Sequence, residues 1–245
     1  MKTEWYKDWF ETKEYLNIYR HRNEVEAEDL VNTIINNVKH SKSDKVLDMA
    51  CGTGRHSILF AKKGYKVTAV DLSKNMLSVA RKKAAAENLE IDFIQSDLRY
   101  FAHSGEFGLA INLFTSFGYF ETDEENFEIF NTAYKHLQKG GYFVLDFFNK
   151  YFVEKNLILE SHDSIEKLDV IQKRKIDGLR VVKEITIRDN DHFKKYYESV
   201  RMFSQSELVN ELTRIGFAIE RTFGDFQGNK FDQFSSPRII IIAKK

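Results

Sequence analysis

From Lys45 to Phe148, short apolar runs alternate along the chain with segments of helical periodicity. This alternation is typical of βαβ units, in which helices connect neighbouring parallel strands. Right-handed crossovers between such strands predict an α/β fold with an open, doubly wound, Rossmann-like and mostly parallel sheet. The expected strands are Lys45–Met49, Lys66–Asp71, Ile91–Gln95, Gly108–Phe114 and Tyr142–Phe148, and the expected helices are Arg55–Lys63, Lys74–Asn88 and Asp123–Leu137.

Additional segments flank this core. Residues 4–38 carry apolar and aromatic side chains at helical spacing, which predicts two helices with a break near residues 21–23. After Asn149, β-rich runs separated by turn signals predict an antiparallel β insertion behind the fifth strand. Its expected strands are Val170–Ile176, Arg180–Arg188 and Lys194–Phe203, followed by a helix, Ser206–Ile215, and two last strands, Ala218–Phe223 and Arg238–Ala243. We predict an N-terminal helical lid (1–40), a cofactor-binding core (41–150), an acceptor-side insertion (151–204) and a completion of the core (205–245).

Composition excludes several classes of protein. The 245 residues contain 37 Lys and Arg against 37 Asp and Glu, so no net positive charge attracts nucleic acid or an anionic membrane. Cys51 is the single cysteine, which excludes an internal disulfide and favours a reducing compartment. The chain shows neither the apolar core of a signal peptide nor a run long enough to span a membrane. We expect a soluble, cytoplasmic protein without a bound metal.

The expected site lies at the carboxyl ends of the strands, where ligands of open α/β sheets bind. Asp48, the loop 52–54, Asp71 and Asp97 should gather there. The two glycines of the loop allow a tight turn and a close approach to a ligand, and a carboxylate after the second strand can accept ribose hydroxyls. A dinucleotide fingerprint requires a third glycine where this chain has Ser57, and the three carboxylates would repel a pyrophosphate. These residues therefore favour a cationic ligand that contains a ribose.

Four motifs, in this order, resemble those of class I S-adenosylmethionine-dependent methyltransferases: Val46–His56, Val70–Ser73, Ser96–Arg99 and Leu137–Gly141. The resemblance implies S-adenosyl-L-methionine as cofactor and S-adenosyl-L-homocysteine as product. It implies that Asp48 and Gly52 lie near the methionine part, Asp71 and Leu72 at the ribose, and Asp97 and Leu98 at the adenine. The expected cofactor contacts are Tyr19, Asp48, Ala50, Cys51, Gly52, Gly54, Arg55, His56, Asp71, Leu72, Met76, Asp97, Leu98, Asn112 and Phe114.

Two positions depart from the pattern of the family. Ala50 stands where a first glycine is common, and we expect it to need only an ordinary negative φ. Gly108 stands where an aspartate is frequent, and the sequence does not show what replaces that charge. We expect Cys51 to pack within the loop rather than to act as a nucleophile.

The rest of the chain is similar to small-molecule methyltransferases that modify amines of sugars or amino acids. Trp5, Trp9, Tyr15 and Tyr19 fit an acceptor lid and plain helix packing equally well. Methyl transfer from a sulfonium depends on positioning and desolvation, and it needs a base only for a protonated or hydroxyl acceptor. We predict a methyltransferase that acts on nitrogen or oxygen of a small-molecule acceptor, with the insertion as a candidate surface for oligomerisation.

The catalytic group and two other functions stay open at this point. Tyr119 and His21 are the candidates for a catalytic role. One alternative is methylation of RNA or protein, against which the zero net charge and the missing N/D-P-P-Y/F signature at Asn112 argue. The other alternative is a module that binds S-adenosylmethionine without catalysis.

Overall fold

A seven-stranded sheet forms the centre of the computed structural model, which describes residues 4–19, 24–39, 41, 44–165, 168–189 and 192–245. The strands are β1 (Lys45–Met49), β2 (Lys66–Asp71), β3 (Ile91–Gln95), β4 (Phe107–Asn112), β5 (Leu137–Phe148), β10 (Ala218–Phe223) and β11 (Arg238–Lys244). Their order is β10-β11-β5-β4-β1-β2-β3, and β11 runs antiparallel to both of its neighbours. The strand order reverses between β1 and β4, so their carboxyl ends border the crevice where such sheets bind ligands.

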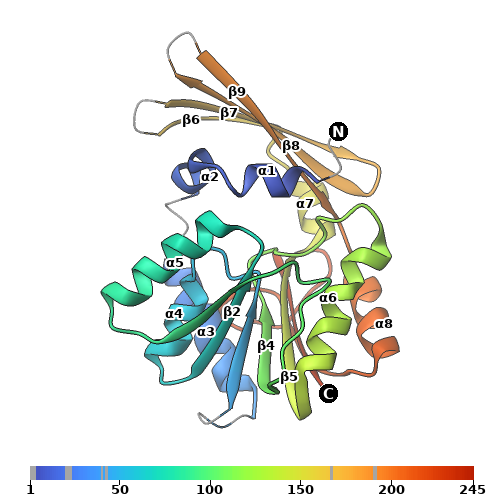
Figure 1. Cartoon of the computed structure of the whole chain (residues 1–245). Helices are drawn as coiled ribbons and strands as arrows, with labels where there is room; N and C mark the ends of the chain where they lie inside the picture. Colours follow the sequence, from blue (N-terminus) through green and yellow to red (C-terminus); the bar gives the residue numbers. More distant parts are fainter. Residues whose placement is uncertain (1–3, 20–23, 40, 42–43, 166–167, 190–191) are drawn as a thin grey trace.

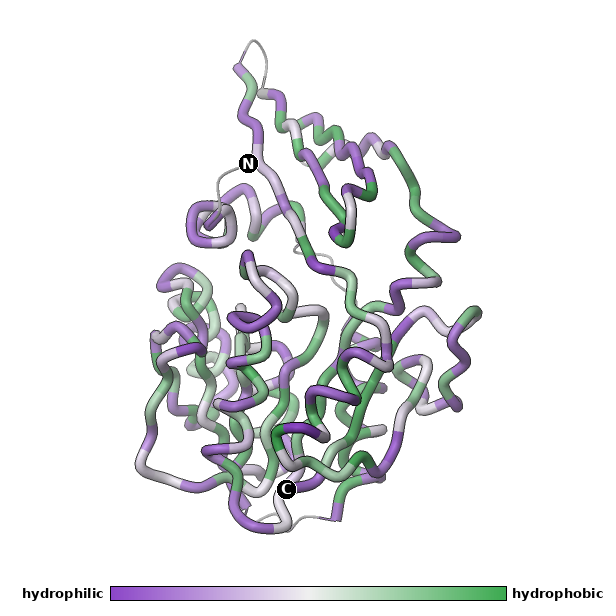
Figure 2. Tube along the Cα trace, turned by 90° about the vertical axis from the view of Figure 1, so that its right-hand side faces the viewer, coloured by the Kyte–Doolittle hydropathy of each residue, from purple (hydrophilic) through white to green (hydrophobic). Residues whose placement is uncertain are grey.

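Helices cover both faces of this sheet (Figure 1). One face packs against α3 (Glu24–Asn37), α4 (Arg55–Lys62) and α5 (Lys74–Ala86), and the other packs against α6 (Asp123–His136) and α8 (Gln205–Ile215). Because both faces are covered, the central strands are almost continuously apolar, and Figure 2 shows them as hydrophobic stretches. Within the described residues, no helix is both long and apolar enough to cross a membrane.

Side-chain caps determine where three of these helices begin. The hydroxyl of Ser73 accepts a hydrogen bond from the N–H of Met76, as expected for the N-cap of α5. Thr122 and Ser204 form capping boxes with the glutamate three residues later, at the starts of α6 and α8.

A second, antiparallel sheet stands apart from the central sheet and consists of β6 (Glu160–Ile165), β7 (Leu168–Asp177), β8 (Arg180–Asp189) and β9 (His192–Arg201). We call it the insertion sheet. It follows α7 (Lys150–Asn156). Helices α1 (Trp5–Trp9) and α2 (Lys13–Ile18), which we call the N-terminal cover, lie between the insertion sheet and the core (Figure 1). A separate apolar cluster joins the cover to the insertion sheet through residues such as Trp9 and Ile185.

The predicted fold class is confirmed, and the differences are local. The first expected helix is split, because the side chain of Thr12 accepts from the N–H of Tyr15 and starts α2. Helix α3 packs on the central sheet through Leu30, Val31 and Ile34, so the segment above the site is shorter than the expected lid 1–40. The expected break near residues 21–23 lies outside the described residues. Helix α7 and strand β6 were not expected, and β5 begins five residues earlier than predicted, before the Gly140–Gly141 pair.

Close packing explains the glycine at position 108. A Cβ on Gly108 would lie 2.4 Å from the Cβ of Asp44, which is too close for any side chain. The carboxylate of Asp44 in turn accepts a hydrogen bond from the N–H of Ser41 at 2.8 Å. Glycine at this position therefore makes room for the turn before β1.

Candidate active site

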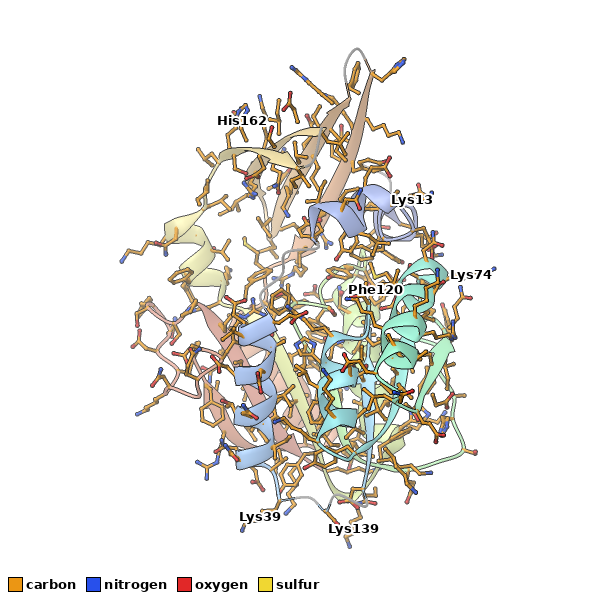
Figure 3. All side chains as sticks on the ribbon, turned by 90° about the vertical axis from the view of Figure 1, so that its left-hand side faces the viewer. Lys13, Lys39, Lys74, Phe120, Lys139 and His162 are labelled. Carbon is orange, nitrogen blue, oxygen red and sulfur yellow. The ribbon has the colours of Figure 1, made fainter. Side chains whose placement is uncertain are left out.

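A cavity of about 720 Å³ opens beneath the N-terminal cover, at the carboxyl ends of the central strands. One part of its wall is the loop after β1 together with the carboxylates of Asp71 and Asp97. The other part is aromatic and comes from the cover and from the chain after β4: Tyr6, Phe10, Tyr15, Tyr19, Phe114, Tyr119 and Phe120. Figure 3 shows Phe120 between the cover, marked by Lys13, and the central strands.

Most of the expected cofactor contacts line this cavity. They are Tyr19, Ala50, Cys51, Gly52, Arg55, His56, Asp71, Leu72, Met76, Asp97, Leu98 and Phe114. Asp48, Gly54 and Asn112 are not among the lining residues. These three are buried or packed behind the wall, where they shape the loop and the strand ends.

The loop after β1 contains three residues in the left-handed region: Ala50 (φ 65°), Gly52 (φ 57°) and Gly54 (φ 77°). The expectation of a negative φ at Ala50 is therefore wrong, because the chain leaves β1 in a conformation that favours glycine. Gly54 is required by packing, since a Cβ there would lie 3.0 Å from the Cβ of Ala80 on α5. Gly52 lines the cavity, and no side chain separates its backbone from a ligand.

Asp71 connects this loop to the start of α5. Its carboxylate accepts hydrogen bonds from the N–H of Gly52 at 2.7 Å and from the N–H of Ser73 at 2.8 Å. Burial raises the pKa of Asp71 although these bonds act in the opposite direction. Each carboxylate oxygen has a second lone pair, so the group can still accept hydroxyl groups of a ligand.

Asp48 supports the loop from below. It is 2% exposed, and its carboxyl group accepts a hydrogen bond of 2.5 Å from the hydroxyl of Ser57. Burial raises the pKa of Asp48 to about 7, and the nearby Asp71 carboxylate adds to the rise. Ser57, which replaces the third glycine of a dinucleotide fingerprint, thus holds the end of β1 in place.

The negative charge around the cavity is smaller than the three carboxylates suggest. The guanidinium of Arg99 donates to both oxygens of Asp97, at 3.1 and 2.7 Å, and also to Glu125 at 2.7 Å. Burial would raise the pKa of Asp97, but the hydrogen bonds from Arg99 and its charge lower it below the usual value. Asp97 is therefore ionised but paired, and Asp48 is partly protonated near neutral pH. Asp71 is the remaining carboxylate of the three on which a cationic ligand depends.

Strand β4 ends two residues earlier than expected because the chain turns sharply after it. Phe114 (φ 60°) and Thr115 (φ 63°) are both left-handed, which is unfavourable for an aromatic and for a β-branched residue. Asp146 on β5 stabilises this turn: its carboxylate accepts from the N–H of Phe114 at 2.8 Å, and its carbonyl accepts from the N–H of Thr115 at 3.1 Å. Backbone strain of this kind gathers at functional sites, and here it places the Phe114 ring in the cavity wall.

Neither candidate for a catalytic role gains support as a base. The hydroxyl of Tyr119 donates to the main-chain carbonyl four residues earlier at 2.5 Å, so it stabilises the turn after β4. His21 lies outside the described residues.

Two other polar residues of the expected site have structural roles. Asn112 is fully buried and donates to the main chain of β1 at 2.9 Å. Burial raises the pKa of the Cys51 thiol well above its usual value, which agrees with a packing role.

Sequence reasoning missed the contacts that hold the cover in place. The carboxylate of Glu11 accepts from the N–H groups of Lys74 and Asn75, at 2.6 and 3.3 Å, and thereby docks on the N-terminus of α5. The hydroxyl of Ser73 also donates to the carbonyl of Phe10 at 3.1 Å. These pairs join residues more than sixty positions apart, and the partners in the cover, Phe10 and Glu11, belong to no recognisable motif. On the opposite side, the cover contacts Glu198 on β9.

Comparisons with known proteins identify the class. Residues 46–141 match the methyltransferase domain family. The chain is 26% identical over 213 residues to the dTDP-3-amino-3,4,6-trideoxy-alpha-D-glucopyranose N,N-dimethyltransferase of Streptomyces venezuelae, covering 83% of this chain and 87% of that one. A structure of an S-adenosylmethionine-dependent methyltransferase from Clostridium acetobutylicum ATCC 824 aligns with a TM-score of 0.79 at 21% identity, covering 94% and 95% of the two chains. CalS10, an amino pentose methyltransferase from Micromonospora echinaspora, aligns with a TM-score of 0.70 at 21% identity, covering 95% and 97%.

The fold and the matched segment define a methyltransferase domain. The chain is an S-adenosylmethionine-dependent methyltransferase, and its segment 46–141 is the part that matches the methyltransferase domain family.

Proposed function

We propose that this enzyme transfers the methyl group of S-adenosyl-L-methionine to a nitrogen or oxygen atom of a small-molecule acceptor bound beneath the N-terminal cover. One observation carries the proposal: a single cavity joins the glycine loop and Asp71 to the aromatic side chains of the cover. Its volume of about 720 Å³ lies within the range of about 300–1,000 Å³ that is typical of small-molecule sites. The cofactor and an acceptor can therefore meet in one space.

The part of the wall that contains the glycine loop and Asp71, which we call the donor half, suits this cofactor. S-adenosyl-L-methionine supplies a methyl group that is already activated on a sulfonium. Gly52 lines the cavity in a left-handed conformation, and its lack of a side chain leaves the loop backbone open to a ligand at that point. Asp71 would accept the ribose hydroxyls, and Leu72 and Leu98 would pack against the adenine. The N-terminus of α4, with Arg55, would receive the carboxylate of the methionine part.

The aromatic part of the wall, which we call the acceptor half, excludes water and orients the acceptor. The rings of Trp5 and Tyr119 meet edge to face at 5.3 Å, and Tyr6 and Phe120 do so at 5.5 Å. Enclosure by such rings removes solvent around the transferred methyl group, and orientation alone supplies on the order of 7 to 11 kcal/mol to reactions of this kind. Because the Streptomyces venezuelae relative is named as an N,N-dimethyltransferase of an amino sugar, we favour an amine as the acceptor group.

Isothermal titration calorimetry tests the donor half. We expect S-adenosyl-L-methionine and S-adenosyl-L-homocysteine to bind to the wild-type protein, and NADH not to bind. Gly52→Val places a branched side chain at a left-handed residue of the cavity wall, so it should abolish binding. Binding of NADH in place of both adenosyl compounds would refute the proposal.

A panel of amino sugars, amino acids and hydroxylated metabolites tests the acceptor half. We expect release of S-adenosyl-L-homocysteine with at least one amine-bearing compound. If turnover occurs instead with RNA or with a protein substrate and with none of the small molecules, the proposed acceptor class is wrong.

A further inference from the structure

The carboxylate of Glu198, on β9, collects three hydrogen-bond donors beside the cavity. Its Oε1 accepts from the indole N–H of Trp9 at 2.8 Å and from the hydroxyl of Tyr19 at 2.7 Å. Its Oε2 lies 2.6 Å from the ammonium of Lys183, the cross-strand neighbour on β8. Lys183 also donates to the Tyr19 hydroxyl at 2.7 Å. The hydroxyl of Tyr19 therefore donates to Glu198 and accepts from Lys183, and these two hydrogen bonds together fix its position.

This ion pair lies away from solvent. The side chains of Lys183 and Glu198 are 20% and 16% exposed. Burial alone would raise the pKa of Glu198, but the charge of Lys183 and the hydrogen bonds from Lys183, Tyr19 and Trp9 outweigh it, and the pKa falls below its usual value. Removing two charges from water is costly, and apolar residues of similar size often join two segments equally well. Stability alone is therefore a weak reason for an ion pair at this place.

Tyr19 stands at the C-terminal end of a short helix. It follows the last residue of α2, a helix of six residues, which is too short to be stable alone. Its ring lines the cavity, lies 4.7 Å from the ring of Tyr15, and faces the ammonium of Lys183 at 5.3 Å. The insertion sheet, in contrast, pairs β8 and β9 over ten residues in regular register. A rigid sheet thus holds the end of a weak helix.

We propose that Lys183 and Glu198 are positioning residues for methyl transfer, which hold Tyr19 against the bound cofactor. Among the described residues that line the cavity, none belongs to the insertion sheet. The sheet nevertheless sets the geometry of the cavity through this ion pair. The inference rests on the proposed function and on the expectation from the sequence that Tyr19, which lines the cavity, contacts S-adenosyl-L-methionine.

A double-mutant cycle tests the inference on the full chain, with S-adenosyl-L-homocysteine as the probe. Calorimetry gives the Kd for the wild type, Glu198→Gln, Tyr19→Phe and the double variant. Each single change should raise the Kd about tenfold, because each releases the Tyr19 ring from the ion pair. The double variant should be no weaker than the weaker single variant, since both changes act through the same contact. Kd increases that multiply in the double variant would overturn the inference.

Two further variants separate positioning from folding. Glu184→Gln breaks the neighbouring, more exposed pair of Glu184 with Lys195, 3.2 Å apart on the same two strands, and should leave the Kd unchanged. Lys183→Met combined with Glu198→Leu replaces the ion pair with apolar groups but leaves the Trp9 N–H and the Tyr19 hydroxyl without their acceptor. The melting temperature should therefore fall, and the Kd is measured at a temperature where the variant stays folded. Its Kd should stay about tenfold raised, because the apolar pair cannot bind the Tyr19 hydroxyl. A Kd restored to the wild-type value would show that packing is sufficient and would overturn the inference.

The experiment also separates this inference from the proposed function. A wild-type protein that does not bind S-adenosyl-L-homocysteine would refute the proposed function itself. A wild-type protein that binds it, together with a Glu198→Gln variant of equal affinity, would refute the positioning role alone.

Discussion

Ala50 holds its backbone in a conformation that costs an alanine free energy. Its φ of 65° is left-handed, like those of Gly52 and Gly54 in the same loop. For a residue with a Cβ this region is less favourable by about 1–2 kcal/mol, whereas glycine adopts it freely. The loop is nevertheless held in place, because the N–H of Cys51 donates to the carbonyl of Val70 and Asp71 binds the N–H of Gly52. The surrounding hydrogen bonds therefore offset the free-energy cost of this one residue.

Ala50→Gly should stabilise the protein. Relief of the left-handed strain outweighs the greater chain entropy of glycine in the unfolded state, so we expect a gain of up to about 1 kcal/mol in the free energy of unfolding. Urea denaturation measures it. Ala85→Gly, in the last turn of α5, is the control at a residue with ordinary helical backbone and should destabilise the protein by up to about 1 kcal/mol. Equal losses from both variants would contradict the strain at Ala50.

The carboxyl group of Asp48 should make stability depend on pH. Its pKa is raised from 3.8 to about 7 in the folded protein, so between these values the folded state keeps a proton that the unfolded state releases. The contribution of Asp48 to stability is therefore present at low pH and falls as pH rises through this window, by about 1 kcal/mol per pH unit. Asp48→Asn removes the titration but retains an oxygen that can accept from Ser57. Urea midpoints at several pH values should show a flatter profile for the variant, and parallel profiles would contradict the prediction.

Asp71→Ala should weaken cofactor binding more than folding. The change removes the acceptor of two backbone N–H groups and the group proposed to bind the ribose. We expect the Kd for S-adenosyl-L-homocysteine to rise roughly 10- to 100-fold, which corresponds to the loss of hydrogen bonds to a charged group. Asp71→Asn, which retains one acceptor oxygen, should lie between the wild type and Asp71→Ala in calorimetry. An unchanged affinity in Asp71→Ala would place the ribose elsewhere.

Single motif residues could be predicted from the sequence, but most of their partners could not. The order of the motifs placed Asp71 and Asp97 at the cavity, since both follow strands whose ends meet. It did not reveal that Arg99 neutralises Asp97, because a neighbouring arginine can equally face solvent. The left-handed φ of Ala50 was also missed, since most alanines avoid it.

At the scale of the elements, the cover contacts the core and the insertion sheet in different ways, and the difference determines which contact opens for ligand exchange. Towards the core it combines an exposed polar contact, made by Glu11 at the N-terminus of α5, with the buried rings of Trp5 and Tyr6, which meet Tyr119 at 5.3 Å and Phe120 at 5.5 Å. Towards the insertion sheet it buries Trp9, whose ring stacks on Tyr196 at 4.3 Å. The contact of Glu11 with α5 is therefore the most exposed of these contacts. We expect the cover to separate from α5 when ligands exchange.

Glu11→Ala should accelerate ligand exchange. Loss of a carboxylate at a helix N-terminus costs about 1 kcal/mol, which makes dissociation of S-adenosyl-L-homocysteine roughly fivefold faster. Stopped-flow fluorescence of Trp5 and Trp9, both in the cover, can follow it. Glu14→Ala removes a pair between the cover and Lys194 of the insertion sheet and serves as the control with an unchanged rate. An equal acceleration in both variants would contradict a gate on the side of the core.

Strands with an apolar or β-branched local pattern were predictable, and a strand without one was not. Strands β1, β2, β3 and β10 have the expected bounds. Strand β6, in contrast, has an exposed and mostly polar sequence, so neither its period nor its composition indicates a strand. Its hydrogen bonds with β7 form it, and such long-range pairing is not visible in a local pattern.

At the scale of the whole molecule, the cavity wall combines segments that are far apart in the sequence. Tyr6 and Tyr19 come from the first residues of the chain, and Phe120 comes from its middle. A ligand in this space contacts parts of the protein that separate on unfolding. Ligand binding should therefore stabilise the folded chain as a unit.

S-adenosyl-L-homocysteine should raise the melting temperature. At about one hundred times its Kd, a ligand that binds the folded state stabilises it by about 2.7 kcal/mol, or about 5–10 °C for a chain of this size. Differential scanning calorimetry measures the shift. NADH at the same concentration is the control and should give none. An equal shift with both compounds would indicate binding that does not depend on the donor site.

The matched segment supplies the donor part of the cavity wall and also Phe114, Tyr119 and Phe120, but not the cover. Residues 46–141 contain the glycine loop, Asp71 and Asp97, whereas the cover and the insertion sheet lie outside them. Mutations in the cover and the insertion sheet that spare Tyr19, Lys183 and Glu198 can therefore accumulate with little effect on donor binding. Substrate range and methyl-donor use can then change separately in one chain. A library that varies residues 4–18 and 168–201, with Lys183 and Glu198 kept, should yield enzymes with new acceptors and an unchanged affinity for S-adenosyl-L-methionine.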